Sequence, residues 1–156
     1  MTRPWDIRPL TEHDVERVGA VLGLARLEQG DGLYLVAWQG DEPIGHVYLA
    51  FADPAELQDV AVRKEHRRRG VASTLAEAAG REAAARGVDR LRIVVSIDDK
   101  AAQALYRKCG YLETSIPPTR VLGPVVIRTG AIEVDDTLLT WEKRLAAGPS
   151  HARPPR

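Results

Sequence analysis

The segment Leu57-Gln-Asp-Val-Ala-Val-Arg-Lys-Glu-His-Arg-Arg-Arg-Gly-Val-Ala-Ser73 runs from an apolar strand through a basic loop into the small residues of a helix start. The first turn of a helix has unpaired backbone N–H groups and the positive end of the helix dipole, which suit a phosphate. Gly70 and Ala72 would let a ligand approach the backbone closely. Neither a Walker A loop nor a Gly-x-Gly-x-x-Gly sequence is present, which disfavours the corresponding nucleotide sites. From these residues alone, an anion-binding turn and an ordinary basic helix start are equal alternatives.

Charge is unevenly distributed along the chain, although 22 Lys and Arg residues balance 22 Asp and Glu residues. Residues 1–62 sum to −7 and residues 63–69 sum to +4. The basic segment is therefore either solvated surface or a place where an anion binds. Because the net charge is zero and aromatic residues make up only 5% of the chain, we expect no nucleic-acid partner.

Length and cysteine content narrow the class of protein further. The 156 residues suit one domain with a single core. One cysteine, Cys109, excludes a disulfide framework and fits a reducing cytoplasm, where we expect the protein to be located. We expect no metal, because the four histidines lack paired metal-ligand spacing. No apolar stretch has the length of a membrane span and no secretory signal is evident, so we expect no membrane partner.

Strand and helix patterns alternate along the chain. Strands are predicted at 5–10, 33–38, 44–51, 57–62, 91–97, 111–112 and 137–143, and helices from about residue 11, at 71–86 and at 100–109. The apolar run 91–97 is typical of a strand buried on both faces. The order predicts one α/β (α+β) domain with a mixed sheet and helices on its faces. We place the domain at 1–146 and a mobile tail at 147–156, and residues 116–134 form a Pro- and Gly-containing insertion with a further strand or hairpin near 125–127.

Two motifs resemble those of one enzyme family. Arg67-x-x-Gly70-x-Ala72 is similar to the Arg/Gln-x-x-Gly-x-Gly/Ala motif of the GCN5-related N-acetyltransferases, the GNAT family. About 30 residues later, the segment from Asp99 to Tyr111 resembles the family's second motif, Asn-x-x-Ala-x-x-Leu-Tyr-x-x-x-Gly-Phe. The resemblance extends over nearly the whole chain, from Trp5 to about Leu145. It implies the GNAT fold, a mostly antiparallel sheet whose central strands, here 60–62 and 91–97, splay apart.

The resemblance also implies a cofactor site. Acetyl-CoA would be the co-substrate, with its pantetheine arm paired to the strand 60–62 and its pyrophosphate held by the N–H groups of 68–73. The residues expected to bind it are Val60, Ala61, Val62, Arg67, Arg68, Arg69, Gly70, Val71, Ala72, Ser73, Asp99 and Tyr106. The reaction implied is direct transfer of the acetyl group to a primary amine.

That reaction needs an acid and a base. Tyr106 occupies the family's general-acid position, and a phenol near its usual pKa could protonate the leaving thiolate. Glu56 stands where the histone-type branch of the family has a catalytic Glu, so it is the candidate base, with Asp59 or a water chain as alternatives. Strand alternation would place Glu56 and Gln58 on one face with Val60 and Val62, and Asp59 on the other.

Several further hypotheses accompany this interpretation. Asp99 replaces the family's usual Asn, and we expect it to cap the helix that follows. We expect Cys109 to be a small buried hydrophobic residue rather than a nucleophile. Trp38, Tyr48 and Phe51 fit a core or a dimer surface better than an acceptor pocket, and a homodimer would be in keeping with the family. The alternative to an enzyme is a non-catalytic acyl-CoA-binding sensor or partner module. The acidic balance of residues 1–62 points to a cationic acceptor, which could be a small molecule or a protein or peptide amine.

Overall fold

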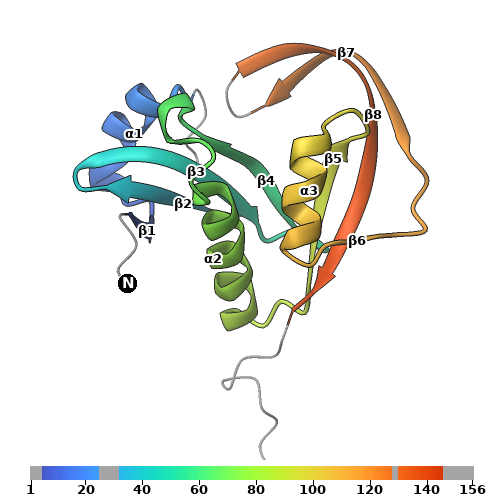
Figure 1. Ribbon diagram of the computed structural model, residues 1–156, viewed down its shortest axis with the longest axis horizontal. Coiled ribbons are helices and arrows are strands. Elements are labelled where there is room, and N and C mark those ends of the chain that lie inside the picture. The colour runs from blue at the N-terminus through green and yellow to red at the C-terminus, as the bar shows by residue number, and fades with distance from the viewer. Residues whose placement is uncertain (1–4, 25–31, 128–129, 146–156) are drawn as a thin grey trace, which may run out of the picture.

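The computed structural model describes residues 5–24, 32–127 and 130–145, and its elements follow the predicted order (Figure 1). The strands are β1 (Asp6–Pro9), β2 (Gly32–Gln39), β3 (Glu42–Ala50), β4 (Ala55–Val62), β5 (Arg90–Ser96), β6 (Leu112–Glu113), β7 (Thr119–Ile127) and β8 (Gly130–Arg144). The α-helices are α1 (Val15–Leu22), α2 (Val71–Ala85) and α3 (Lys100–Lys108), and short 3-10 turns span η1 (Glu12–Asp14) and η2 (Lys64–His66). The predicted tail 147–156 and the domain end at 146 lie outside the described residues.

One sheet organises the domain. Its strand order is β1-β2-β3-β4-β5-β8-β6, with β7 paired to β8 alone. Every pairing is antiparallel except the one between β4 and β5. The sheet is therefore mixed, as the order of elements predicted, and mostly antiparallel, as the family resemblance implied. The insertion 116–134 forms the predicted hairpin, in which β7 pairs with a β8 that begins at Gly130 rather than near 137.

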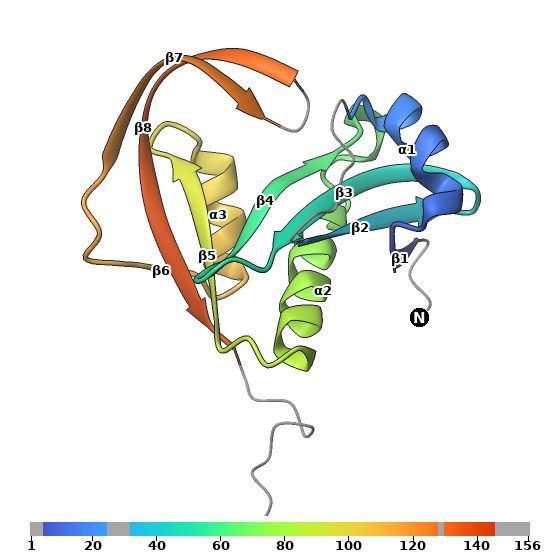
Figure 2. The same cartoon turned by 180° about the vertical axis from the view of Figure 1, so that it is seen from behind.

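Helices cover both faces of the sheet, and each face has its own apolar cluster (Figures 1 and 2). In the larger cluster, the buried face of α2, which includes Leu75 and Ala79, packs against β2–β5 and β8. The smaller cluster packs Val18 of α1 against Tyr34, Trp38 and Tyr48 of the β2–β3 hairpin. Of the three aromatic residues expected in a core or a dimer surface, Trp38 and Tyr48 are buried in the core, and Phe51 is partly buried against the larger cluster. None of the helices in the described ranges has the length and hydrophobicity that spanning a bilayer requires.

A β-bulge in β4 separates the two central strands. Tyr48 of β3 pairs with Gln58 and His46 pairs with Ala61, so that two residues of β4, Asp59 and Val60, lie opposite one residue of β3. Asp59 has a φ of +53°, a conformation that side chains other than glycine rarely adopt. A bulge bends its strand and increases the local twist. Accordingly β4 pairs with β5 only at Ala55 and Glu56, and the strands splay beyond that point, as expected.

The bulge overturns the predicted alternation along β4. Before it, Glu56 and Gln58 pair with Ala50 and Tyr48, which belong to the α1 face of the sheet. After it, Val60 and Val62 pack against the cluster on the α2 face. The prediction that Glu56 and Gln58 share a face with these valines was wrong, because the extra residue at Asp59 shifts the two-residue period by one position.

The strand β5 also differs from its prediction. Leu91, Ile93 and Val95 are buried, but Val94 is 42% exposed, so only one face of β5 is packed. The cause is the splay of β4 from β5, which leaves the Val94 face of β5 next to a cleft rather than a second packed layer. The exposed side chain of Val94 therefore lies at this cleft.

His46 is a buried imidazole at the centre of β3. Its side chain is 2% exposed, its ring lies 6.2 Å from the Tyr34 ring, and its Nδ1 has no hydrogen-bond partner among the described residues. Burial lowers the pKa of His46 from 6.5 to about 4, because the charged form cannot be hydrated there. The folded state therefore requires neutral His46.

We expect His46 to make the folded state sensitive to acid. Between pH 6.5 and about 4, His46 binds a proton in the unfolded chain but not in the folded chain. The contribution of neutral His46 to the free energy of unfolding is therefore complete above pH 6.5 and is lost as the pH falls toward 4. The shift corresponds to a loss on the order of 3 kcal/mol. Urea unfolding at pH 7 and pH 4.5 should show a smaller pH effect in His46→Leu than in the wild type.

The matched control is His13→Gln, which replaces an exposed histidine and should retain the wild-type pH effect. An equal pH effect in His46→Leu and the wild type would contradict the proposed burial of a neutral imidazole.

Candidate active site

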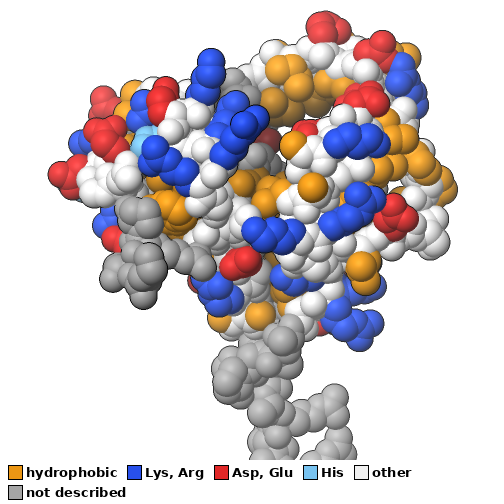
Figure 3. Space-filling view, in the orientation of Figure 1, with side chains coloured by type: hydrophobic (Ala, Val, Ile, Leu, Met, Phe, Trp, Pro, Cys, Tyr) orange, Lys and Arg blue, Asp and Glu red, His pale blue; other side chains and the backbone are white. Residues whose placement is uncertain are grey.

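Two cavities meet at Tyr106 in the cleft between β4 and β5. The cavity beside α2, which we call the α2 cavity, has a volume of about 590 Å³, and the cavity beside β7, the β7 cavity, has a volume of about 430 Å³. Tyr106 of α3 lines both cavities. Figure 3 shows the hollow between the two halves of the molecule, with basic side chains at its rim and apolar side chains below the β7–β8 hairpin. A molecule that occupies both cavities would pass the Tyr106 side chain.

The start of α2 gives the α2 cavity its polar end. Arg68 and Gly70 have φ values of +64° and +85°, and these turn the basic loop into the helix. A Cβ at Gly70 would meet no atom within 4 Å, so the glycine is required by its backbone angle rather than by crowding. The N-cap residue of α2 is Gly70, so no N-cap side chain bonds the first turn of this helix. The N–H groups of residues 71–73, which have no partner within the helix, therefore lie at the cavity that these residues line.

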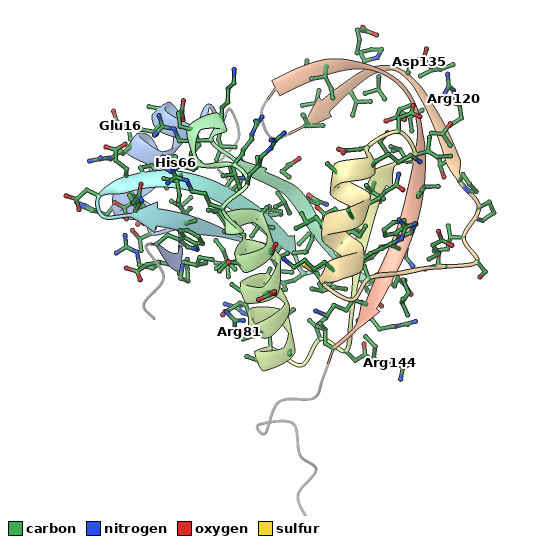
Figure 4. The ribbon with its side chains drawn as sticks, viewed as in Figure 1. Glu16, His66, Arg81, Arg120, Asp135 and Arg144 are labelled. Atoms are coloured by element: carbon green, nitrogen blue, oxygen red, sulfur yellow. The ribbon has the colours of Figure 1, made fainter. Side chains whose placement is uncertain are left out.

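The loop is tied to the end of β4 by an arginine. The Arg67 Nε donates a hydrogen bond of 3.0 Å to the carbonyl oxygen of Val62. His66 lies on the same loop, ahead of α2 (Figure 4). Beyond Glu56, β4 has no partner in β5, so the backbone edge of residues 60–62 faces the α2 cavity. An extended polar chain could pair with this edge while its phosphates meet the helix start.

The predicted cofactor residues gather at the α2 cavity with one exception. Those that line it are Val60, Ala61, Val62, Arg67, Arg68, Gly70, Val71, Ala72, Ser73, Asp99 and Tyr106. Arg69 is exposed and does not line the cavity. Sequence reasoning missed His66, Ala101, Ala102 and Leu105. Helical spacing would have found the last three, since they share the face of α3 that holds Tyr106.

The β7 cavity has an acidic side and an apolar side. Glu56 and Asp59 of β4 line it together with Gln58, whose Nε2 donates to Glu56 Oε1 over 3.3 Å. Val94 of β5 and Val126 and Ile127 of β7 form the opposite wall. The structure thus brings both predicted carboxylates to one cavity with Tyr106. The three apolar residues were not anticipated.

Tyr106 keeps its proton throughout the neutral range. Burial is the largest cause, and together with negative charge on Cys109, Asp99 and Asp59 it raises the pKa of Tyr106 from 10 to about 12. Both burial and nearby negative charge disfavour the phenolate. The expectation of a phenol near its usual pKa is therefore corrected to a phenol whose pKa is raised. Its hydroxyl is a persistent hydrogen-bond donor at the junction of the cavities.

Hydrogen bonds to the end of β5 hold α3 in place. The Asp99 side chain accepts a bond of 3.0 Å from the Ala102 N–H, which confirms that Asp99 caps the helix. Gln103 is buried, and its Nε2 donates to the carbonyl oxygens of Ser96 and Ile97, each over 2.9 Å. Because Gln103 lies almost one turn before Tyr106, these bonds fix the direction from which the phenol enters the cleft.

Two other candidate chemistries find little support. Cys109 is buried at the end of α3, and burial raises the pKa of its thiol, which disfavours the nucleophilic thiolate. Within the ranges that the structure describes, no three His, Cys, Asp or Glu side chains are grouped so that they could hold a metal ion.

Comparisons with known proteins agree with this geometry. Residues 2–111 match the family model described as "Acetyltransferase (GNAT) family". No curated protein matches the chain significantly. Among solved structures, the Escherichia coli ribosomal-protein-S18-alanine N-acetyltransferase is 18% identical, with a TM-score of 0.70 over 96% of this chain and 99% of that one.

Two further solved structures have the same fold. A Bacillus subtilis acetyltransferase in complex with CoA is 20% identical, with a TM-score of 0.70 over 91% of this chain and 99% of that one. The spermidine N-acetyltransferase of Vibrio cholerae, in complex with CoA and spermine, is 16% identical, with a TM-score of 0.66 over 91% and 96%. At these identities the likeness establishes the fold, a curled, mostly antiparallel sheet with helices.

Proposed function

Since the chain belongs to the GNAT acetyltransferase family, we propose that it transfers the acetyl group of acetyl-CoA directly to a primary amine. The observation that carries this proposal is the position of Tyr106 between the α2 cavity and the β7 cavity. One cavity then receives the cofactor, the other receives the acceptor, and the reaction occurs where they meet.

The α2 cavity fits acetyl-CoA. The uncapped first turn of α2 and the basic side chains before it suit the pyrophosphate, and the edge of β4 at 60–62 suits the amide groups of the pantetheine arm. The B. subtilis structure of the same fold contains CoA, which supports the assignment. Acetyl-CoA supplies a thioester carbonyl carbon that an amine can attack. The sulfur would lie toward Tyr106, where the two cavities join.

The proposed transfer needs two proton movements. The amine nitrogen forms a bond to the acetyl carbon, the carbon–sulfur bond breaks, and the nitrogen loses a proton while the sulfur gains one. We assign the donation to the Tyr106 hydroxyl, whose raised pKa keeps it protonated until the sulfur leaves. The phenol then recovers a proton equivalent to the one that the amine released.

A base must receive the amine proton, because an alkylammonium ion cannot attack. We propose Glu56 for this role, with Asp59 as the alternative, since both line the β7 cavity. Glu56→Gln should lower kcat/KM most at low pH, where the amine is most protonated, and Asp59→Asn should change it less. The opposite ranking in pH profiles from 6 to 9 would assign the base to Asp59, and two unaltered profiles would leave a water chain as the route.

Removal of the Tyr106 hydroxyl should slow the chemical step. We expect Tyr106→Phe to lower kcat about ten-fold or more, the effect of losing a general acid, while the ring continues to pack 5.6 Å from the Tyr111 ring. The measurement is thiol release from acetyl-CoA with an accepted amine, together with the dissociation constant of acetyl-CoA. An unchanged kcat would exclude the acid role, and a loss confined to acetyl-CoA affinity would indicate a binding role instead.

A pair of substitutions on α3 tests the cofactor assignment. Ala101 and Ala104 are both exposed, but only Ala101 lines the α2 cavity. Ala101→Glu should weaken acetyl-CoA binding about ten-fold or more, because its carboxylate would enter the cavity and repel the phosphates. Ala104→Glu, with the same change in helix propensity and charge, should bind acetyl-CoA as the wild type does. Equal affinities in calorimetric titration would contradict the assignment.

The alternative function is a non-catalytic acyl-CoA sensor. Its main argument was Asp99 in place of the family's Asn, but the Asp99 cap on α3 gives that residue a structural purpose. Tight acetyl-CoA binding without thiol release across a panel of primary amines would favour the sensor. Thiol release that depends on an added amine would favour the enzyme.

A further inference from the structure

The wall of the β7 cavity opposite the carboxylates is apolar and exposed. Val94 of β5 is 42% exposed and Val126 of β7 is 66% exposed, and Ile127 completes the wall. Contact between water and these apolar side chains is unfavourable, at about 25 cal/mol for each Å² of apolar surface. A ligand with an apolar part would cover this surface and gain binding energy from it.

The β7–β8 hairpin holds part of this wall over the cleft. The hairpin arches away from the rest of the sheet above α3 and β5 (Figures 1 and 2). Near its base, the charged side chains of Arg120 and Asp135 pair with each other across the two strands (Figure 4). Near its tip, Val126 and Ile127 line the cavity. Among the residues that the structure describes, the hairpin therefore contributes the apolar Val126 and Ile127 to the cavity.

The two sides of the cavity differ in what they can bind. Glu56 and Asp59 favour a cation, and they lie on β4. The valines and Ile127 lie on β5 and β7, and they favour a group without charge. A polyamine that spans the cavity would place its second cation against the apolar wall and lose part of its hydration. An amine with one charged end and an apolar body matches both sides.

We propose that the acceptor is an amphipathic primary amine, with its amino group beside Glu56 and Asp59 and its alkyl or aryl body against Val94, Val126 and Ile127. This inference rests on the proposed acetyl transfer and adds the class of acceptor.

The first test compares alkylamines of increasing chain length, and then a monoamine with a diamine of the same carbon number. The specificity constant kcat/KM, measured by thiol release, should rise from propylamine to hexylamine by up to about fourfold for each added methylene, the factor that about 0.8 kcal/mol gives. The kcat/KM of hexylamine should exceed that of 1,6-diaminohexane, which has the same six carbons and carries a second ammonium group on its last carbon. A flat series, or a preference for the diamine, would overturn the inference.

The second test compares substitutions of two exposed apolar residues on β7, one inside the cavity and one outside it. Val126 and Leu122 are similarly exposed, at 66% and 69%, and lie on the same face of β7, but only Val126 lines the cavity. Val126→Ser should reduce the preference for hexylamine over propylamine at least threefold, and Leu122→Ser should leave it unchanged. Urea unfolding of both variants checks that the hairpin substitution has not altered stability. Equal preferences in both variants would overturn the placement of the apolar body.

The two proposals fail in different ways. Transfer to amines without the chain-length preference would overturn only the acceptor class. Absence of transfer to any amine, with acetyl-CoA bound, would overturn the proposed function and this inference together.

Discussion

The β-bulge at Asp59 is the constraint on which the candidate site depends. Two residues of β4 lie opposite one residue of β3, and the positive φ of Asp59 bends β4 away from β5 after only two residue pairs. The gap that opens exposes the edge of β4, which regular pairing with β5 would have occupied. The bulge also divides β4 by face, so that Glu56 and Gln58 lie toward the β7 cavity and Val60 and Val62 toward the α2 cavity. One local irregularity thus produces two chemically different halves of a single cleft.

The position of Tyr106 connects these halves. Its helix is anchored by the Asp99 cap and by Gln103, whose amide bonds two carbonyl oxygens at the end of β5. Its phenol is buried enough to have a raised pKa, yet it borders both cavities. Burial makes proton loss to solvent unfavourable, which suits a group that must hold its proton until a leaving group needs it. The same low-polarity surroundings strengthen any hydrogen bond that the hydroxyl makes there.

Much of the fold could be predicted from the sequence, whereas the bulge in β4 and part of the cavity lining could not. Apolar periodicity located most of the described strands and helices, but it indicated β7 only near 125–127 and missed the first part of β8. The two motifs located the helix start at Gly70 and the helix that carries Tyr106. The bulge was missed because an Asp with positive φ leaves no local pattern, and the face of Glu56 was wrong as a direct result. Val94, Val126 and Ile127 were missed because their meeting depends on contacts between strands far apart in sequence. Arg69 was included with its basic neighbours, although side-chain direction within a turn cannot be read from charge alone.

A crystal structure of the protein with CoA tests the central claim most directly, namely that Tyr106 stands between the cofactor and the acceptor. We predict that the phosphates lie at the first turn of α2, that the pantetheine arm follows β4, and that the CoA sulfur lies within hydrogen-bonding distance of the Tyr106 hydroxyl at the opening of the β7 cavity. CoA bound with its sulfur away from Tyr106, or with its phosphates away from the start of α2, would contradict the claim.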